Sequence, residues 1–159
     1  MTAQIPDVLW YEGEKYPLCA LPLRDYFDLE GTSPEFAAPS SVLWRGYVGK
    51  WEIRDDRLYL IELTGRLKSG DSLTLATLFP DFPERVFAHW SSRILRVPQG
   101  GLVEYVHAGF GSVYERDLFL EIDEGILRRT WTKKNGKAQK AAKRQGYRIH
   151  ALTTFGRPQ

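Results

Sequence analysis

Apolar and polar positions alternate with a period of two through much of the chain, most clearly over residues 42–63, "VLWRGYVGKWEIRDDRLYLIEL". This period is typical of strands with one buried face. A two-residue turn at the Asp-Asp pair would place Ile53 opposite Leu58 and Trp51 opposite Leu60 on that face. The segment therefore predicts a long β-hairpin that starts at residue 42.

Shorter runs of the same kind predict further strands between turns that contain Gly, Pro or Ser, at 85–90, 93–97, 102–108, 112–122 and 126–132. The N-terminal segment predicts another hairpin, with Gly13 in its turn. Pro17 lacks an amide hydrogen, which places the second strand of this hairpin at a sheet edge.

Two segments predict short helices. Residues 22–29 begin with a proline at a favourable first position, and residues 73–79 follow Asp71 or Ser72 as N-cap and end at Pro80. The predicted class is α+β, mainly antiparallel β: one strongly bent or barrel-like sheet with two or three short helices in a single domain, 1–159. Residues 133–148 are predicted to form a basic helix or arm.

The composition is that of an ordinary globular chain, with 43% hydrophobic and 26% charged residues. We expect no membrane span, because no long apolar run is present, and no signal peptide, because the N-terminus lacks a basic and then an apolar region. Cys19 is the single cysteine, which fits a reducing compartment. The predicted location is therefore cytoplasmic.

The charge is distributed unevenly, although the formal net charge is only +2. Twelve of the 22 basic residues and all 20 acidic residues precede Gly125, so this part carries −8 and the remainder +10. Such asymmetry is typical of an interaction arm. The alternative is that the basic segment folds back on the acidic part of its own chain.

Residues 104–117, "EYVHAGFGSVYERD", gather the densest group of chemically active side chains. One hypothesis is an enzyme in which His107 works with Glu104 or Glu115 as an acid–base pair and Arg116 holds an anion. The alternative is a solvated hairpin with surface ion pairs, which we favour because the spacing matches no catalytic motif.

The segment "LWRGYVGKW" offers a second candidate site, since Arg45 and Tyr47 could line a pocket. The favoured alternative is a bent strand whose Trp44 and Trp51 fill the core. Gly46 and Gly49 predict a bulge or a close backbone approach there. Further tyrosines that could contact a ligand or partner are Tyr105 and Tyr114.

The basic segment interleaves cations with Trp131 and Tyr147, a pattern that can neutralise phosphates and stack bases. The nucleic-acid candidates are Arg128, Arg129, Lys133, Lys134, Lys137, Lys140, Lys143 and Arg144. No metal site is predicted, because the three histidines are widely spaced and the cysteine is alone, and no cofactor is expected, because phosphate-binding and nucleophile motifs are missing.

The blocks "LWRGY", "WEI", "LYL" and "GSVYERDLFL" are similar to a pattern shared by a widespread family of small, stand-alone bacterial proteins of unknown function. The resemblance extends from Ser41 to Ile122, with Phe110 where relatives carry Tyr, and it does not include the part from Arg128 onward. It implies a shared body but brings no activity.

These observations favour a non-catalytic binding protein, and an immunity-type neutraliser of a bacterial toxin is one such protein. An acidic surface can mask and rapidly capture a basic, nucleic-acid-directed toxin. Nucleic-acid binding through the basic segment and the enzyme that uses His107 are the alternatives.

Overall fold

The computed structural model describes residues 3–38 and 40–138. Its strands belong to one sheet, in which the main path runs β2-β1-β3-β4-β9-β8-β7 while β5 and β6 pair with β4. The elements, in chain order, are β1 (Asp7–Tyr11), β2 (Glu14–Leu18), α1 (Pro22–Glu30), β3 (Tyr47–Arg54), β4 (Arg57–Arg66), β5 (Ser72–Leu73), α2 (Leu75–Leu78), β6 (Val86–Phe87), β7 (Arg93–Glu104), β8 (Val113–Asp123) and β9 (Ile126–Lys134).

The two hairpins predicted from alternation are confirmed. β3 and β4 pair through a turn at Asp55 and Asp56, with Ile53 opposite Leu58 and Trp51 opposite Leu60. β1 and β2 form the N-terminal hairpin, and β2 ends the sheet path as Pro17 predicted. The sheet is antiparallel except between β1 and β3, which run parallel.

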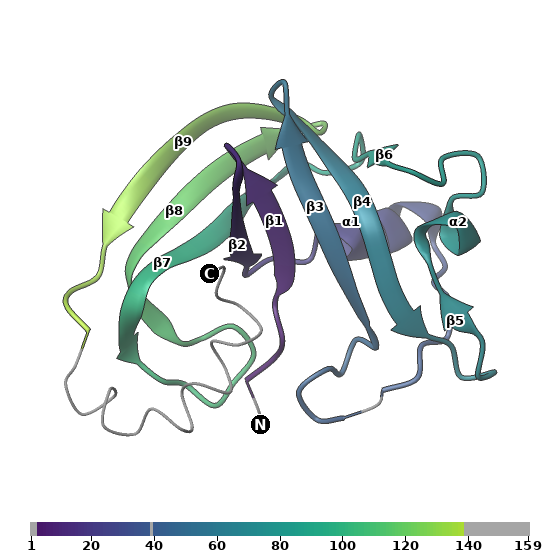
Figure 1. Cartoon of the computed structure of the whole chain (residues 1–159), viewed down its shortest axis with the longest axis horizontal. Coiled ribbons are helices and arrows are strands. Elements are labelled where there is room, and N and C mark those ends of the chain that lie inside the picture. The colour runs from purple at the N-terminus through teal and green to yellow at the C-terminus, as the bar shows by residue number, and fades with distance from the viewer. Residues whose placement is uncertain (1–2, 39, 139–159) are drawn as a thin grey trace.

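The sheet is strongly curved, and Figure 1 shows the long strands β7, β8 and β9 bending around one side while the helices lie beside β4. It is not closed into a barrel, so only the bent form of the prediction holds. β4 and β9 pair only at Arg57 and Ile126. The end strands β2 and β7 approach each other where the Cys19 amide donates to the Arg96 carbonyl at 2.9 Å.

Several predicted boundaries are wrong for local reasons. Residues 42–46 form a turn, so β3 begins only at Tyr47. Strands predicted at 93–97 and 102–108 are one strand, β7, because register shifts after Gln99 absorb the intervening glycines. The N-cap of α2 is Thr74, which forms a capping box with Thr77, so the helix is shorter than predicted.

The core lies between the two halves of the curved sheet. Trp51, Leu58 and Leu60 are fully buried there, together with Leu95 and Leu120 from the other half. Trp44, by contrast, is 53% exposed, so its predicted core position is wrong because the turn before β3 directs it outward. No helix in the described part of the chain is long and apolar enough to cross a membrane.

A buried ion pair joins β1 to the turn before β3. Asp7, fully buried, accepts a hydrogen bond from Arg45 Nη2 at 2.7 Å, and from the Gly49 amide and Trp51 Nε1, each at 3.0 Å. Burial raises the pKa of the Asp7 carboxyl above its usual range, while Arg45 and the two neutral donors oppose that shift. This cluster holds the parallel β1–β3 pair in register.

Gly46 explains the glycine in the "RGY" block. Its φ of +79° lies in the left-handed region, and a Cβ there would come within 2.5 Å of the Ala37 carbonyl oxygen. The close backbone approach predicted at this glycine is confirmed.

Candidate functional site

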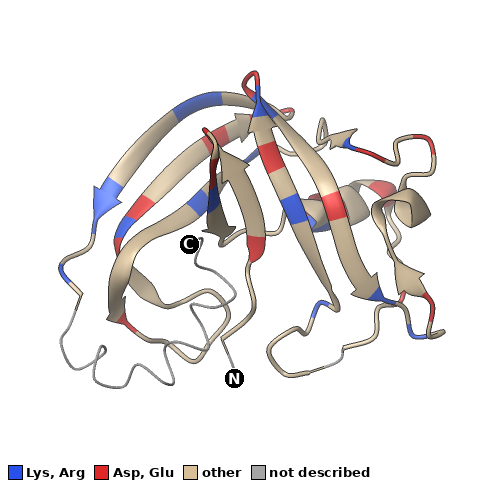
Figure 2. Cartoon of the chain, in the orientation of Figure 1, with Lys and Arg blue, Asp and Glu red and all other residues tan. Residues whose placement is uncertain are grey.

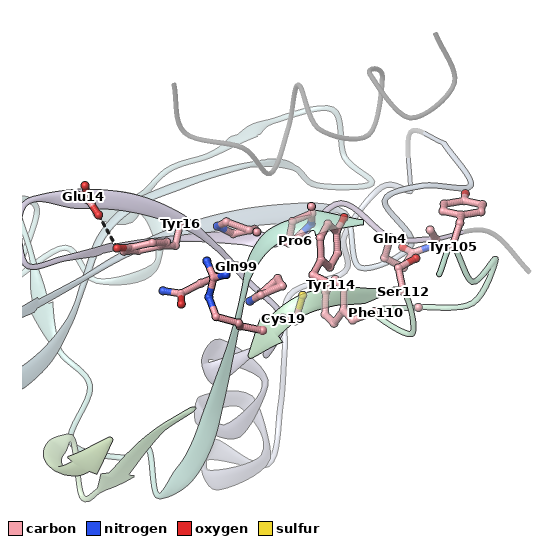
Figure 3. A pocket seen from close by; sticks show the side chains of 17 residues that line it. Gln4, Pro6, Glu14, Tyr16, Cys19, Gln99, Tyr105, Phe110, Ser112 and Tyr114 are labelled. Atoms are coloured by element: carbon pink, nitrogen blue, oxygen red, sulfur yellow. Dashed lines mark hydrogen bonds between the residues drawn. The ribbon is translucent and has the colours of Figure 1, made fainter. Parts of the chain in front are cut away.

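A cavity of about 610 Å³ opens between the N-terminal hairpin and the paired ends of β7 and β8. Its apolar walls consist of aromatic and proline side chains: Tyr16, Tyr105, Phe110, Tyr114, Pro6, Pro17 and Pro98. Its polar and ionisable groups are Gln4, Glu14, Cys19, Gln99, Ser112 and Arg116. In Figure 3, Glu14 and Tyr16 lie at one end of this group and Tyr105 at the other, so the cavity is elongated.

The cavity exists because two sheet edges that face each other cannot pair along their length. In a two-residue hairpin, the two residues that flank the turn, here Tyr11 and Glu14, form a hydrogen-bonded pair. Hydrogen-bonded and non-hydrogen-bonded pairs then alternate along the hairpin. Pro17 belongs to a non-hydrogen-bonded pair, so its backbone nitrogen and carbonyl point away from β1. The Arg96 carbonyl faces β2, and Pro98 follows two residues later on the same side. Neither proline has an amide hydrogen to donate, and the gap between the edges stays open.

The wall formed by residues 105–112 is held in place by Arg96. Its guanidinium donates to the carbonyl oxygens of Phe110 at 2.6 Å and Ser112 at 2.8 Å, and to Asp117 Oδ1 at 2.8 Å. The other Asp117 oxygen accepts from Asn135 Nδ2 at 3.0 Å. Arg96 is thus a positioning residue that fixes Phe110 and Ser112 against the cavity.

Three ionisable side chains of the cavity, Tyr16, Cys19 and Tyr114, have raised pKa values and therefore stay protonated at neutral pH. Burial raises the pKa of the Cys19 thiol to about 11 and also raises the pKa of Tyr114. The Tyr16 hydroxyl donates to Glu14 Oε2 at 2.5 Å, and this bond, which favours the protonated phenol, raises the pKa of Tyr16 to about 12. Cys19 is therefore an unreactive thiol in the wall and not an activated nucleophile.

This pKa predicts slow alkylation of Cys19. A rise from 9.0 to about 11 lowers the thiolate fraction at pH 8 by about 100-fold, so iodoacetamide should react about 100-fold more slowly than with a cysteine peptide. The rate should keep rising with pH up to about 11, and urea-unfolded protein should react at the peptide rate. A folded-state rate within threefold of the peptide's would contradict the prediction.

The four predicted catalytic residues are not brought together in this cavity. Arg116 lines it, whereas Glu104 and His107 are exposed and do not. His107 packs edge-on against Tyr105, with ring centroids 4.3 Å apart. Glu115 lies beside the cavity, where it accepts hydrogen bonds from the amides of Gly101 at 2.7 Å and Ala138 at 3.3 Å.

Of the four ligand-contact candidates, Tyr105 and Tyr114 line the cavity and Arg45 and Tyr47 do not. Arg45 is used in the ion pair with Asp7. Tyr47 is only 3% exposed and packs against Phe27 and Phe36, with ring centroids 6.3 and 5.0 Å away. The "RGY" block therefore supports the fold in this structure.

The basic candidates divide into three groups. Arg128 and Arg129 pair with Asp123 and Glu121 on the neighbouring strand, at 3.7 and 2.8 Å. Arg129 also covers the ring of Trp131, which stacks on Phe119. The cations with no ion pair to a described residue are Lys133, Lys134 and Lys137, while Lys140, Lys143 and Arg144 lie outside the described residues. Nucleic-acid binding by this segment stays a prediction.

Sequence reasoning missed Tyr16, Cys19 and Gln99 as parts of one site. The two prolines in facing edge strands were a usable signal, but alternation alone does not say which edges face each other. Within the described residues, no group of three or more His, Cys, Asp or Glu side chains could hold a metal ion. No family model, curated protein or solved structure matches the chain.

Proposed function

We propose that the protein is a non-catalytic binding protein and that the cavity between β2 and β7 is its ligand site. The observation that carries this proposal is the cavity itself. Its volume of about 610 Å³ lies in the range of about 300–1,000 Å³ that small-molecule sites occupy, and its walls are mainly aromatic and apolar with a few polar groups.

The side chains in the cavity support binding without catalysis. The described lining includes no histidine, and its one carboxylate, Glu14, already accepts the hydroxyl of Tyr16. The thiol of Cys19 is protonated at neutral pH because burial raises its pKa. No pair of lining groups is therefore arranged to take up and return a proton. An immunity-type neutraliser is a narrower form of this proposal, in which the group bound in the cavity is part of a bacterial toxin.

A neutral fluorescent probe tests the proposal. N-phenyl-1-naphthylamine should bind saturably, one molecule per chain, with enhanced emission. Tyr105→Ala should weaken binding about tenfold, because burying an aromatic side chain contributes about 1.5–3 kcal/mol. Trp44→Ala is the matched control, since it deletes an aromatic ring that is 53% exposed and outside the cavity.

Two results would contradict the proposal. One is emission that rises without saturation, and the other is equal weakening of probe binding by Tyr105→Ala and Trp44→Ala. Circular dichroism of each variant separates an effect on the cavity from a loss of folding.

A further inference from the structure

We infer that the ligand of this cavity is an amphipathic anion: a molecule with an apolar body and a single anionic head group, which Arg116 binds. This inference rests on the proposed function and specifies its ligand class. Three features support this inference. Arg116 lines the cavity and forms no ion pair with a described residue, and lysines lie on the adjacent strand β9. The nearby carboxylates of Glu14 and Glu115 already accept hydrogen bonds from other groups of the protein.

Arg116 is the cation of the described lining, and it forms no ion pair with any described residue. This sets it apart from Arg45, Arg93 and Arg96, each of which pairs with an aspartate. A guanidinium presents several donors in a plane and binds carboxylate, sulfonate or phosphate oxygens with two parallel hydrogen bonds.

The end of β9 adds positive charge beside Arg116. Lys134 is the register partner of Arg116, so the two side chains lie on the same face of neighbouring strands. Lys133 and Lys137 are also exposed in this region. Figure 2 shows the positive end of β9 next to β8, the strand that carries Arg116.

No described carboxylate near the cavity forms an ion pair with Arg116. Glu14 is hydrogen-bonded by Tyr16, and both oxygens of Glu115 accept backbone amides. The approach of Ala138 to this carboxylate depends on Gly101, since a Cβ at that glycine would come within 2.7 Å of the Ala138 Cβ. The carboxylates are thus held by protein donors, while the Arg116 guanidinium is available to an anion.

The remaining wall fits an apolar body. Tyr114, Phe110 and Tyr105 present aromatic surface, and Pro17 and Pro98 present rings without amide donors. Because these prolines cannot extend a β-ladder, the edges do not recognise a ligand as an added strand. Recognition therefore depends on apolar contact along the cavity and on one charged contact at Arg116.

Two probes with the same ring system test the inference on the full-length protein. N-phenyl-1-naphthylamine is neutral, and 8-anilinonaphthalene-1-sulfonate carries an added sulfonate. The sulfonate probe should bind about tenfold more tightly at low salt, since hydrogen bonds to charged groups are the strong ones. This preference should shrink as salt increases. Arg116→Gln should bring the ratio of the two affinities close to one.

Arg128→Gln is the matched control, because it removes an exposed arginine of β9 that does not line the cavity; it should keep the wild-type ratio. Equal affinity for the two probes in the wild type, or an unchanged ratio in Arg116→Gln, overturns the inference and leaves the proposed function intact. Failure of both probes to bind overturns both.

Competition then identifies the body of the ligand. Displacement of the sulfonate probe by 1-naphthoate supports an aromatic acid, and displacement by decanoate supports an aliphatic one. Displacement by neither carboxylate overturns the inference.

Discussion

Replacement of Asp7 with alanine is expected to lower the free energy of unfolding by about 3–5 kcal/mol, the loss that is typical when one partner of a buried ion pair is removed. The Arg45 side chain, only 6% exposed, would remain charged without its carboxylate. The Gly49 amide and the Trp51 indole would also lose their acceptor. Urea unfolding followed by circular dichroism measures the change.

Two variants show whether the burial of the pair is the cause. Glu62→Ala removes the exposed ion pair with Lys50, whose side chains are 53% and 41% exposed, and should cost less than about 1 kcal/mol. The loss of stability in Asp7→Asn should lie between the losses in Glu62→Ala and Asp7→Ala. Both oxygens of the Asp7 carboxylate accept hydrogen bonds, so the amide nitrogen of an asparagine would face a donor at one of these positions. A loss below about 1 kcal/mol for Asp7→Ala would contradict this account.

Arg96→Ala is expected to lower stability by about 2–4 kcal/mol, because it leaves a nearly buried Asp117 with Asn135 alone and two carbonyl oxygens without donors. It should also weaken binding of N-phenyl-1-naphthylamine at least about tenfold. The reason is that residues 105–112 lose the side chain that holds them as a preformed wall. Fluorescence titration and urea unfolding give the two values separately.

Arg93→Ala is the control on the same strand. It breaks the ion pair between Arg93 and Asp25, in which the Arg93 side chain is 41% exposed. Neither residue lines the cavity, so the affinity for the probe should not change. Arg96→Lys should restore part of the stability but little of the affinity, because one ammonium cannot reach all three acceptors. Probe affinity of Arg96→Ala equal to that of Arg93→Ala would refute the positioning role.

Local pattern predicted the paired strands well. Alternation in β3 and β4 gave the correct partners for Trp51 and Ile53, because one buried face leaves a single register that hides its apolar side chains. Pro17 placed β2 at an edge because a proline lacks the donor that an inner strand needs. Pattern failed at Trp44, since alternation assumed a strand where the chain turns, and at β7, which continues through two glycines.

The candidate site could not be derived in the same way. The alternation of residues 104–117 says which side chains share a face of one strand, but not what lies across from that face. The structure separates Glu104 and His107 from the cavity and places Arg116, Tyr105 and Tyr114 in its wall.

Local sequence pattern was enough to predict most strands, the β1–β2 and β3–β4 hairpins and the edge position of β2, because these depend on neighbours within a few residues. Three long-range contacts could not be predicted from such patterns: β2 faces β7, Asp7 pairs with Arg45, and Arg96 holds the wall near Phe110. Such contacts depend on how far the sheet curves. Curvature is the sum of small twists over all strands, and no short stretch of sequence contains it.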